Sequence, residues 1–411
     1  MPNNWKTYKL GDLIKVNANS LKKDQIDFIN YIDIKSVGNG TYEIPKKLKF
    51  EEAPSRARRL LKEGDTVISS VRPNLKSFFY SQNLLENTVA STGFAVLTPI
   101  KIDSRFLYYL TTNDSYINFL VKSCTGSAYP AFSPNVVIES QLKIPESLQE
   151  QQQIASILSA LDDKIENNLA MNKTLEDMAM ALYKHWFVDF GPFQESEFVD
   201  SELGMIPKGW EVKRLDEIAE KKSESFNFKE KSEVVFVNTG DVQEGRFLHS
   251  NKISKEGLPG QAKKAIAYGD ILYSEIRPKN KRYAFVDFDS SDYVVSTKFM
   301  IINPKSNILN KLLYRILTMQ SSVDHFNMIA EGRSGTFPQI TFDAISETIF
   351  VLPPKIIQND FQNLVNPMEL KQDKLFAENQ TLSQLRDTLL PKLISGELRL
   401  QEFTATIANA L

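Results

Sequence analysis

Residues 64–73 read GDTVISSVRP and residues 269–278 read GDILYSEIRP, so nearly the same ten residues occur twice in the chain, 205 positions apart. Internal repeats are established first, because a fold built from repeats is misassigned when they are missed. The register of the two copies holds from Trp5 to Pro145, with a three-residue insertion in the second copy. Aligned identities include Trp5 and Trp210, Leu10 and Leu215, Gly40 and Gly245, Pro54 and Pro259, Ala57 and Ala262, and Pro130 and Pro338. The chain is therefore a tandem duplication.

Length and composition describe a globular protein of more than one domain. The 411 residues are too many for one compact core, and two or three domains are expected. Hydrophobic residues make up 42% and charged residues 24% of the chain, which is ordinary for a globular protein. No apolar run approaches the roughly 20 residues that span a bilayer, and the N-terminal MPNNWKTYKL lacks the apolar stretch of a secretion signal. A single cysteine, Cys124, excludes an internal disulfide framework, and a cytoplasmic location is expected.

Each copy mixes short strands with helices. Runs rich in β-branched and aromatic residues, bounded by Gly, Pro, Asn or Asp, predict the strands. These runs are 66–71, 93–99, 270–276 and 299–304, and the accompanying helical stretches are 104–121 and 310–329. The expected fold class is α+β, a tandem duplication of two mixed α/β domains that are each followed by a long helix.

Residues 148–190 contain no Gly or Pro and predict one long helix after the first domain. Its apolar and amide residues recur at alternating spacings of four and three, the pattern of a coiled-coil seam, and an offset of 207 finds the same seam in the second copy. The seams are Ile154, Leu158, Leu161, Ile165, Asn168, Asn172, Leu175, Ala179 and Leu182, and Phe361, Val365, Met368, Gln372, Leu375, Asn379, Leu382, Arg386 and Leu389. Two copies of one seam favour pairing of the two helices with each other, and antiparallel pairing is the simpler topology because each helix must return toward the start of the next domain. The alternative is that each helix covers only its own domain.

Two features of the seam bear on function. Asn172 and Asn379 occupy the same seam position, and a buried Asn there costs stability but fixes the register of the pair. The seam from Ile154 to Leu182 covers 29 residues, or about 43 Å at ~1.5 Å per residue. A turn of duplex DNA is ~34–36 Å. Our hypothesis is that the helical pair holds two DNA-reading domains about one turn apart.

Positive charge gathers at the same place in both copies. The net charge is −2, yet residues 46–80 and residues 251–285 each carry an excess of five positive charges. Such surfaces attract duplex DNA by neutralising phosphates, and the planar Arg fork suits phosphate or guanine. The alternative is an ordinary solvated Lys/Arg face. The candidate DNA contacts are Arg56, Arg58, Arg59, Arg72, Lys76, Lys263, Lys264, Arg277, Lys279, Lys281 and Arg282.

Within the repeated stretch, different residue types have different expected roles. The Gly-Asp pairs at 64–65 and 269–270 predict turns, in which Gly adopts positive φ and Asp bonds nearby backbone. The proline after Arg72 and Arg277 is expected to end the strand. Gly, Asp and Pro are therefore predicted to be scaffold, and the two arginines that they position are the candidate contacts.

Two loops add small donors next to an aromatic residue that precedes proline. They are SCTGSAYPAFS at 123–133 and EGRSGTFPQITF at 331–342. This composition suits a loop that follows the DNA backbone, with contacts from Ser127, Arg333 and Ser334, although an ordinary turn has the same composition.

No catalytic or metal-binding set stands out. The chain has no glycine-rich loop ending in Lys-Ser/Thr, which argues against an ATP-driven motor. It also lacks the NPPY-like tetrapeptide of amino-methyltransferases, and the scattered His185, His249 and His325 have no metal-ligand spacing. A nuclease needs only a few carboxylates, so a self-contained nuclease between the two copies stays as the alternative function.

Three longer strings resemble one known family. They are IPESLQEQQQIASILSALDDKIENNLAMNKTLEDMAMALYKHWFVDFGPF from residue 144, SELGMIPKGWE from residue 201, and LRDTLLPKLISGEL from residue 385. Over essentially its full length the chain resembles the DNA-specificity subunit of a type I restriction–modification system. The resemblance implies two target-recognition domains, each reading one half of a split, asymmetric DNA site, and two helices that pair as an antiparallel coiled coil.

The resemblance further implies which partners the chain has. The helices would fix the gap between half-sites and dock two methyltransferase subunits, and motor-nuclease subunits would join for restriction. No cofactor is expected in this chain, since S-adenosylmethionine, ATP and Mg²⁺ belong to the partners. The aromatic cluster in ALYKHWFVDFGPF (181–193) is either core packing or part of the methyltransferase contact. The expected segments are domains at 1–146 and 208–354, long helices at 147–190 and 355–400, a linker at 191–207 and a tail at 401–411.

Overall fold

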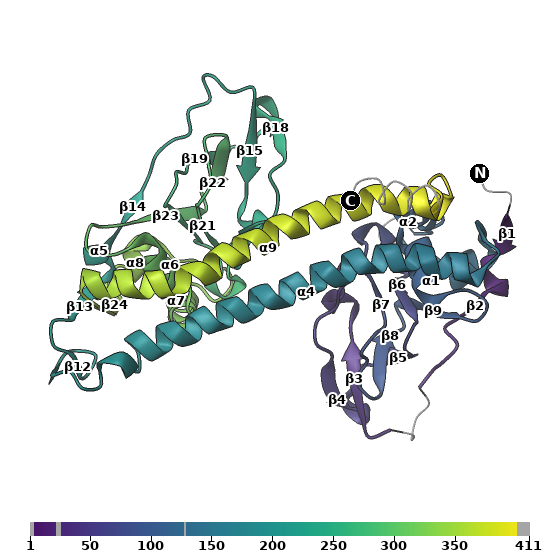
Figure 1. Ribbon diagram of the computed structural model, residues 1–411, viewed down its shortest axis with the longest axis horizontal. Helices are drawn as coiled ribbons and strands as arrows, with labels where there is room; N and C mark the ends of the chain where they lie inside the picture. The colour runs from purple at the N-terminus through teal and green to yellow at the C-terminus, as the bar shows by residue number, and fades with distance from the viewer. Residues whose placement is uncertain (1–3, 22–25, 127–128, 401–411) are drawn as a thin grey trace. The chain divides into compact units, whose positions relative to one another are not determined.

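The computed structural model describes residues 4–21, 26–126 and 129–400. The chain divides into two compact units, Met1–Ala170 with Leu375–Leu411, and Met171–Lys374. Each unit contains one copy of the repeat and one half of each long helix (Figure 1). The helices, which we expected as separate segments, are thus shared between the units, and the predicted tail at 401–411 lies outside the described residues.

The first unit holds two four-stranded sheets. Neighbouring strands are antiparallel in one sheet, whereas the other contains one parallel pair, β3 and β8. The first sheet has the order β2 (Ile14–Val16), β9 (Phe94–Pro99), β6 (Thr66–Ser69) and β7 (Phe78–Tyr80). The second has the order β4 (Lys46–Lys49), β3 (Phe28–Ile32), β8 (Thr88–Ser91) and β5 (Ala57–Leu60). Strand β1 (Trp5–Lys9) pairs with β10 (Gln141–Pro145) and joins the two ends of the domain.

The second unit repeats the strand order of both four-stranded sheets and adds two small strand pairs. Its sheets have the orders β14 (Ala219–Lys222), β23 (Phe299–Pro304), β20 (Ile271–Ser274), β21 (Tyr283–Phe285), and β18 (Lys252–Ser254), β15 (Glu233–Val237), β22 (Tyr293–Ser296), β19 (Ala262–Ala265). Smaller pairs are β13 (Glu211–Arg214) with β24 (Ile349–Leu352), β11 (Phe198–Val199) with β12 (Ile206–Pro207), and β16 (Val242–Gln243) with β17 (Arg246–Phe247). The parallel pair recurs as β15 and β22, and the pairing shifts by one residue at Ala57/Arg59 and at Ala262/Lys264. The predicted duplication and the α+β class are confirmed.

Both units have two helices after the four-stranded sheets and a short third helix before the last strand. The first unit has α1 (Ser104–Thr112), α2 (Asp114–Lys122) and α3 (Pro134–Glu139), and the second has α5 (Leu215–Ile218), α6 (Asn310–Thr318), α7 (Gln320–Arg333) and α8 (Phe342–Ile345). Short 3-10 turns are η1 (Leu10–Asp12), η2 (Ile34–Ser36), η3 (Phe50–Glu52), η4 (Pro73–Leu75), η5 (Gly191–Phe193), η6 (Thr239–Asp241), η7 (Lys255–Gly257) and η8 (Pro278–Asn280). In the second unit α5 takes the place of the 3-10 turn η1. In the described part of the chain, no helix has both the length and the apolar character needed to cross a membrane.

The helical stretches predicted at 104–121 and 310–329 are each two helices. The chain is extended at Asn113 and at Met319, where one helix ends and the next begins. The Asn113 side chain accepts a hydrogen bond from the Tyr116 N–H, so it caps α2 instead of continuing α1. The hydrophobic period continued across the break, which is why the sequence pattern did not reveal it.

The central strand of each domain is buried on both faces. In β6, Val67 belongs to the apolar cluster that contains Phe94, and the adjacent Ile68 belongs to the cluster that contains Phe106 of α1. Successive strand residues point to opposite faces, so β6 separates two layers of core. The loops at the end of this strand are thereby held by packing on both sides.

The long helices α4 (Leu148–Phe187) and α9 (Lys355–Ser395) run antiparallel within each unit. In the first unit, Arg386 donates to Asp162 at 2.9 Å and Asn168 donates to Asn379 at 2.8 Å, so rising numbers on one helix meet falling numbers on the other. In the second unit, Gln372 donates to the carbonyl of Asn172 at 3.1 Å. The predicted antiparallel pairing is confirmed.

A buried glutamine at the start of each long helix ties it to the preceding domain. Gln358 is 1% exposed, accepts from the Leu309 N–H, and donates to the carbonyls of Asn307 and Pro353, all at 2.9 Å. Gln151 has the equivalent position in the first unit, with its amide between Asp103 and Pro145. Both amides donate to and accept from backbone groups of the preceding domain.

We expect Gln358→Ala to destabilise the second unit by ~1–3 kcal/mol, because it leaves buried backbone donors and acceptors without partners. Urea unfolding measures this loss, and hydrogen exchange at the start of α9 locates it. Gln362→Ala is the matched control, since the Gln362 Nε2 makes one side-chain bond at 3.0 Å, to Glu369. An equal loss of stability in both variants would show that the buried hydrogen bonds of Gln358 contribute no more than the single bond of Gln362.

The aromatic cluster at the end of α4 is core. Phe187 packs edge-to-face against Phe361 with ring centroids 4.7 Å apart, and Phe190 and Phe193 pack against Trp210 at 5.4 and 5.1 Å. These residues belong to the main apolar cluster of the second unit or pack on it. Of the two interpretations of this segment, the structure favours packing within the unit.

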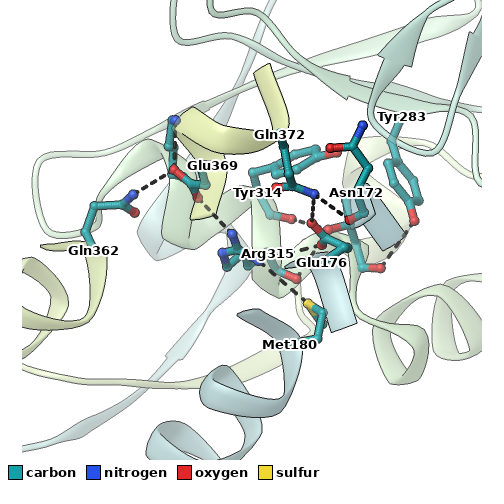
Figure 2. A network of polar contacts seen from close by, with 11 residues as sticks. Asn172, Glu176, Met180, Tyr283, Tyr314, Arg315, Gln362, Glu369 and Gln372 are labelled. Atoms are coloured by element: carbon teal, nitrogen blue, oxygen red, sulfur yellow. Dashed lines mark hydrogen bonds and ion pairs between the residues drawn. The ribbon is translucent and has the colours of Figure 1, made fainter. Parts of the chain in front are cut away.

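Figure 2 shows a polar network that joins α6 to both long helices in the second unit. Arg315 of α6 is 4% exposed, and its guanidinium contacts Glu369 of α9 at 2.8 Å and Glu176 of α4 at 3.6 Å. Lys311 contacts the other oxygen of Glu369 at 2.8 Å. The domain is thus attached to the helical pair through one buried cation as well as through apolar packing.

Candidate nucleic-acid interface

The Gly-Asp pairs at 64–65 and 269–270 are scaffold. The two glycines have φ of 86° and 89°, which side chains disfavour. Both aspartates are buried, and each carboxylate accepts a hydrogen bond of 2.8 Å from the backbone N–H three residues earlier. The predicted turn chemistry is confirmed in both copies.

Arg72 and Arg277 adopt a left-handed backbone conformation, with φ of 49° and 46°. Lys76 and Lys281, at the other end of the same turn, have φ of 52° and 53°. A left-handed residue other than glycine costs roughly 1–2 kcal/mol, and such strain clusters at functional sites. The left-handed conformation recurs at both ends of the Arg-Pro-x-x-Lys turn in both copies, so the two cations leave the backbone in the same geometry in each unit.

Each arginine is stacked on an exposed aromatic ring. The Arg72 guanidinium lies 4.4 Å from the ring centroid of Tyr129, and that of Arg277 lies 5.8 Å from Phe337. Tyr129 is 66% exposed and Phe337 is 48% exposed, although rings of this size are normally buried. We call each pair an Arg–aromatic finger. It presents a planar cation beside an apolar face, which suits a phosphate or a stacked base.

Four backbone segments, joined by hydrogen bonds, hold the finger in place. We call these four segments together the loop edge. In the first unit the segments are joined by backbone bonds of 2.7 to 3.0 Å. These are Thr92 N–H to Arg56 O, Ser70 N–H to Gly93 O, Phe132 N–H to Ser70 O, and Arg72 N–H to Pro130 O. The second unit has the same four bonds at 2.8 to 3.0 Å. They are Thr297 N–H to Gln261 O, Glu275 N–H to Lys298 O, Ile340 N–H to Glu275 O, and Arg277 N–H to Pro338 O.

Several predicted contacts in the first unit are engaged within the protein. Arg56 forms an ion pair with Asp33 at 2.5 Å. Arg59 is partly buried, and burial lowers the pKa of its guanidinium. Arg58 lies at the strand irregularity over the ring of Phe50. Arg72 is exposed, and its guanidinium has no ion pair among the described residues, so the finger arginine is accessible to a ligand.

The second unit divides its cations in the same way. Lys264 donates to the carbonyl of Phe299 at 2.6 Å, and burial lowers the pKa of its ammonium group. Lys263 is exposed at the irregularity equivalent to that of Arg58. Ser334 accepts from the Phe337 N–H at 3.2 Å and therefore supports the finger.

The remaining predicted contacts surround the fingers. Arg277, Lys279 and Arg333 are exposed, and Lys281 and Arg282 are half-buried. Three lysines have surface partners, namely Lys76 with Asp114 at 2.6 Å, Lys279 with Glu331 at 3.6 Å and Lys281 with Glu244 at 3.8 Å. Ser127 lies outside the described residues. The sequence shows an aromatic residue before proline in both loops, but Tyr129 and Phe337 were not among the predicted contacts. Their signal in the sequence is that both copies carry an aromatic residue at this position.

The two seam asparagines differ in their surroundings. Asn379 is buried, accepts from Asn168 and donates to the carbonyl of Ile165 at 3.3 Å. Asn172 is equally buried, but its side-chain amide has no hydrogen-bond partner among the described residues. The position equivalent to Asn168 in the second copy is Leu375, which offers no polar atom. Among the described residues, a side-chain hydrogen bond across the seam is therefore present at Asn379 and not at Asn172, and the register role of both residues stays a prediction.

Two domains of one topology, each with the same exposed finger and joined by paired helices, define a duplicated recognition protein. The family model described as the type I restriction modification DNA specificity domain matches residues 2–177 and 207–363. The chain belongs to this family and is a type I restriction–modification specificity subunit with duplicated target-recognition domains. These comparisons do not support the alternative of a self-contained nuclease.

Individual relatives carry similar descriptions. The type I restriction enzyme HindI specificity subunit of Haemophilus influenzae is 48% identical over 181 residues, which are 44% of this chain and 39% of that protein. The MjaIX specificity subunit of Methanocaldococcus jannaschii is 28% identical over 98% of this chain and 95% of that protein. The crystal structure of a type I restriction–modification S subunit from M. genitalium shares the fold, with a TM-score of 0.55, 14% identity, and coverage of 96% of this chain and 97% of that one.

Proposed function

We propose that each unit binds one half of a bipartite, asymmetric DNA site through its Arg–aromatic finger and the cations around it. The observation that carries this proposal is the recurrence of the strained, exposed finger in both units, at Arg72 with Tyr129 and at Arg277 with Phe337. A second support is the local excess of positive charge in a chain whose net charge is −2. Phosphate neutralisation supplies affinity, and groups on the loop edge supply base discrimination.

The chain acts in this proposal as a non-catalytic subunit in the cytoplasm. The helical pair docks two methyltransferase subunits, and motor-nuclease subunits join the complex for restriction. S-adenosylmethionine, ATP and Mg²⁺ belong to the partners. Met178 of α4 and Leu385 of α9 support the docking surface, because they are 47% and 45% exposed at repeat-equivalent positions. Two identical partners require two such equivalent surfaces.

The test of the proposed function is selection of duplex DNA from a randomised pool by the full chain in its purified complex. We expect a consensus of two unlike half-sites separated by a gap of fixed length. Binding should weaken steeply with salt, since cations that neutralise phosphates release bound counterions. A single undivided consensus, or cleavage of DNA by the purified chain with Mg²⁺ alone, would contradict the proposal.

We further expect the helices to set the gap. Residues 167–173 of α4 and 374–380 of α9 are repeat-equivalent heptads. Deleting both shortens the pair by about 10 Å at ~1.5 Å per residue, which is about three base pairs at ~3.4 Å each. Seven residues are close to two full helical turns, so the facing seams stay in phase. Selection from the randomised pool measures the gap.

The control for this deletion replaces the exposed Lys173 and Gln380 of the same heptads by alanine and keeps the helix length. The control should keep the gap of the unchanged protein. An unchanged gap in the deletion variant would show that the helices do not act as the spacer.

A further inference from the structure

We propose that Glu275 and Lys298 together read one G·C base pair in the half-site bound by the second unit. The Glu275 carboxylate accepts from the cytosine amino group, and the Lys298 ammonium donates to guanine. This assignment rests on the proposed function and adds the residues that distinguish the two half-sites.

Both residues lie on the loop edge beside the finger. The Glu275 N–H donates to the Lys298 carbonyl at 2.9 Å, so the two residues are neighbours on adjacent segments of the loop edge. Glu275 is two residues from Arg277, the cation of the finger. A finger seated on DNA therefore brings both side chains to the same duplex.

In the described part of the chain neither side chain is held by a hydrogen bond or an ion pair, although both act electrostatically on Lys264, where Glu275 raises and Lys298 lowers the pKa of the ammonium group against the larger effect of burial. Among the described residues, Glu275 and Lys298 have no side-chain hydrogen bond and no ion pair within 4.0 Å, and both are partly exposed. By contrast, Lys264 donates to a backbone carbonyl, and Lys279 forms an ion pair with Glu331. Two unpaired charges of opposite sign remain available to a ligand.

The carboxylate is informative because of its surroundings. Residues 251–285 carry eight basic and three acidic residues, so Glu275 lies in the part of the second copy that is expected to meet phosphates. A carboxylate repels phosphate, but it accepts a hydrogen bond from the cytosine N4 amino group in the major groove. Lys donates to guanine O6 and N7, the acceptors on the other base of the same pair.

The first unit cannot make this contact. Its equivalent residues are Ser70 and Gly93, which carry no charge. A Cβ atom at Gly93 would lie 2.3 Å from the Cδ1 atom of Ile34, so a side chain there would require the end of the Ile34 side chain to shift. The residue equivalent to Ile34 in the second copy is the smaller Thr239, which leaves room for Lys298. One backbone frame thus presents two different sets of base-contacting groups.

The experiment is selection from randomised duplex DNA by the full chain in its complex, with Glu275→Gln and Lys298→Met compared with the unchanged protein. We expect both variants to lose about tenfold in discrimination at the same G·C pair, the typical effect of one base contact. The other half-site keeps its consensus. Relaxation at two different half-sites, or an unchanged consensus in both variants, overturns the assignment.

Glu256→Gln is the matched control, because it removes the same charge from the exposed η7 turn of the same basic region. It should leave the consensus unchanged, and relaxation at the same pair would attribute the effect to charge alone and overturn the assignment. Failure of the proposed function looks different, because the unchanged protein would then select no bipartite site. An intact bipartite consensus that ignores Glu275 refutes only the base-reading role.

Discussion

Replacing both finger arginines, Arg72→Ala with Arg277→Ala, is expected to abolish measurable binding of the bipartite site at physiological salt. A charge-assisted hydrogen bond contributes ~1.5–3 kcal/mol, so each substitution alone should weaken binding about 10- to 100-fold. The two fingers lie in separate units, so their effects should add. If each contact is to phosphate, each substitution also flattens the salt dependence by about one unit of slope. Fluorescence anisotropy titrations at several salt concentrations measure both quantities.

Two further variants separate the parts of the finger. Arg277→Lys keeps the charge but loses the planar fork and its stacking on Phe337, so it should keep the salt slope while losing affinity. Lys208→Ala removes an exposed cation of the second unit that is paired with Glu197, and it should change neither quantity. Equal affinities in the two alanine variants and the unchanged protein would remove both arginines from the interface.

The largest expected effect on stability is that of Arg315→Met, about 3–5 kcal/mol of unfolding free energy. The guanidinium is buried and reaches carboxylates on both long helices, at 2.8 Å to Glu369 and 3.6 Å to Glu176 (Figure 2). Its removal leaves Glu369 largely buried with Lys311 as its remaining charged partner. Urea unfolding gives the magnitude, and hydrogen exchange in α6 and α9 locates it in the second unit.

Arg214→Met is the control, because Arg214 forms an exposed ion pair with Asp216, and solvent screening makes such pairs contribute little to stability. Acid provides a second check. Burial alone would raise the pKa of Glu369, but the bonds from Lys311 and Arg315 lower it below the usual 4.5. Its contribution is therefore present above pH 4.5 and is lost as the pH falls through the lowered value. Glu369→Gln should flatten the dependence of the unfolding free energy on pH in this acid range. A similar loss of stability in Arg214→Met and Arg315→Met would contradict the buried role of Arg315.

Much of the architecture could be predicted from the sequence, because repeats and hydrophobic periods are patterns of residues along the chain. The repeat of GDTVISSVRP at 269–278 predicted two copies of one domain, and the seam that begins at Ile154 and recurs at Phe361 predicted two paired helices. The break at Asn113 was missed, since the hydrophobic period runs through it and the Asn caps α2 by a contact that the period does not encode.

The interface was predicted only in part. The charge windows located the basic region, and the repeated phrase selected Arg72 and Arg277. The structure added the exposed Tyr129 and Phe337 that stack on them. It also showed that Arg56 and Lys264 are engaged within the protein. Their partners, Asp33 and Phe299, lie more than twenty positions away in the sequence, which a charge count does not detect.

The sequence by itself determined the duplication, the strand and helix types, and the antiparallel helical pair, because these follow from repeats and periods along the chain. Only the tertiary structure decided which charges are free. Arg315 and Arg277 look alike as residues, yet one is buried between two helices and the other is exposed on a ring. The difference arises because a charge is free or bound according to groups that folding brings from distant positions, and the desolvation of those groups decides the energy of each contact.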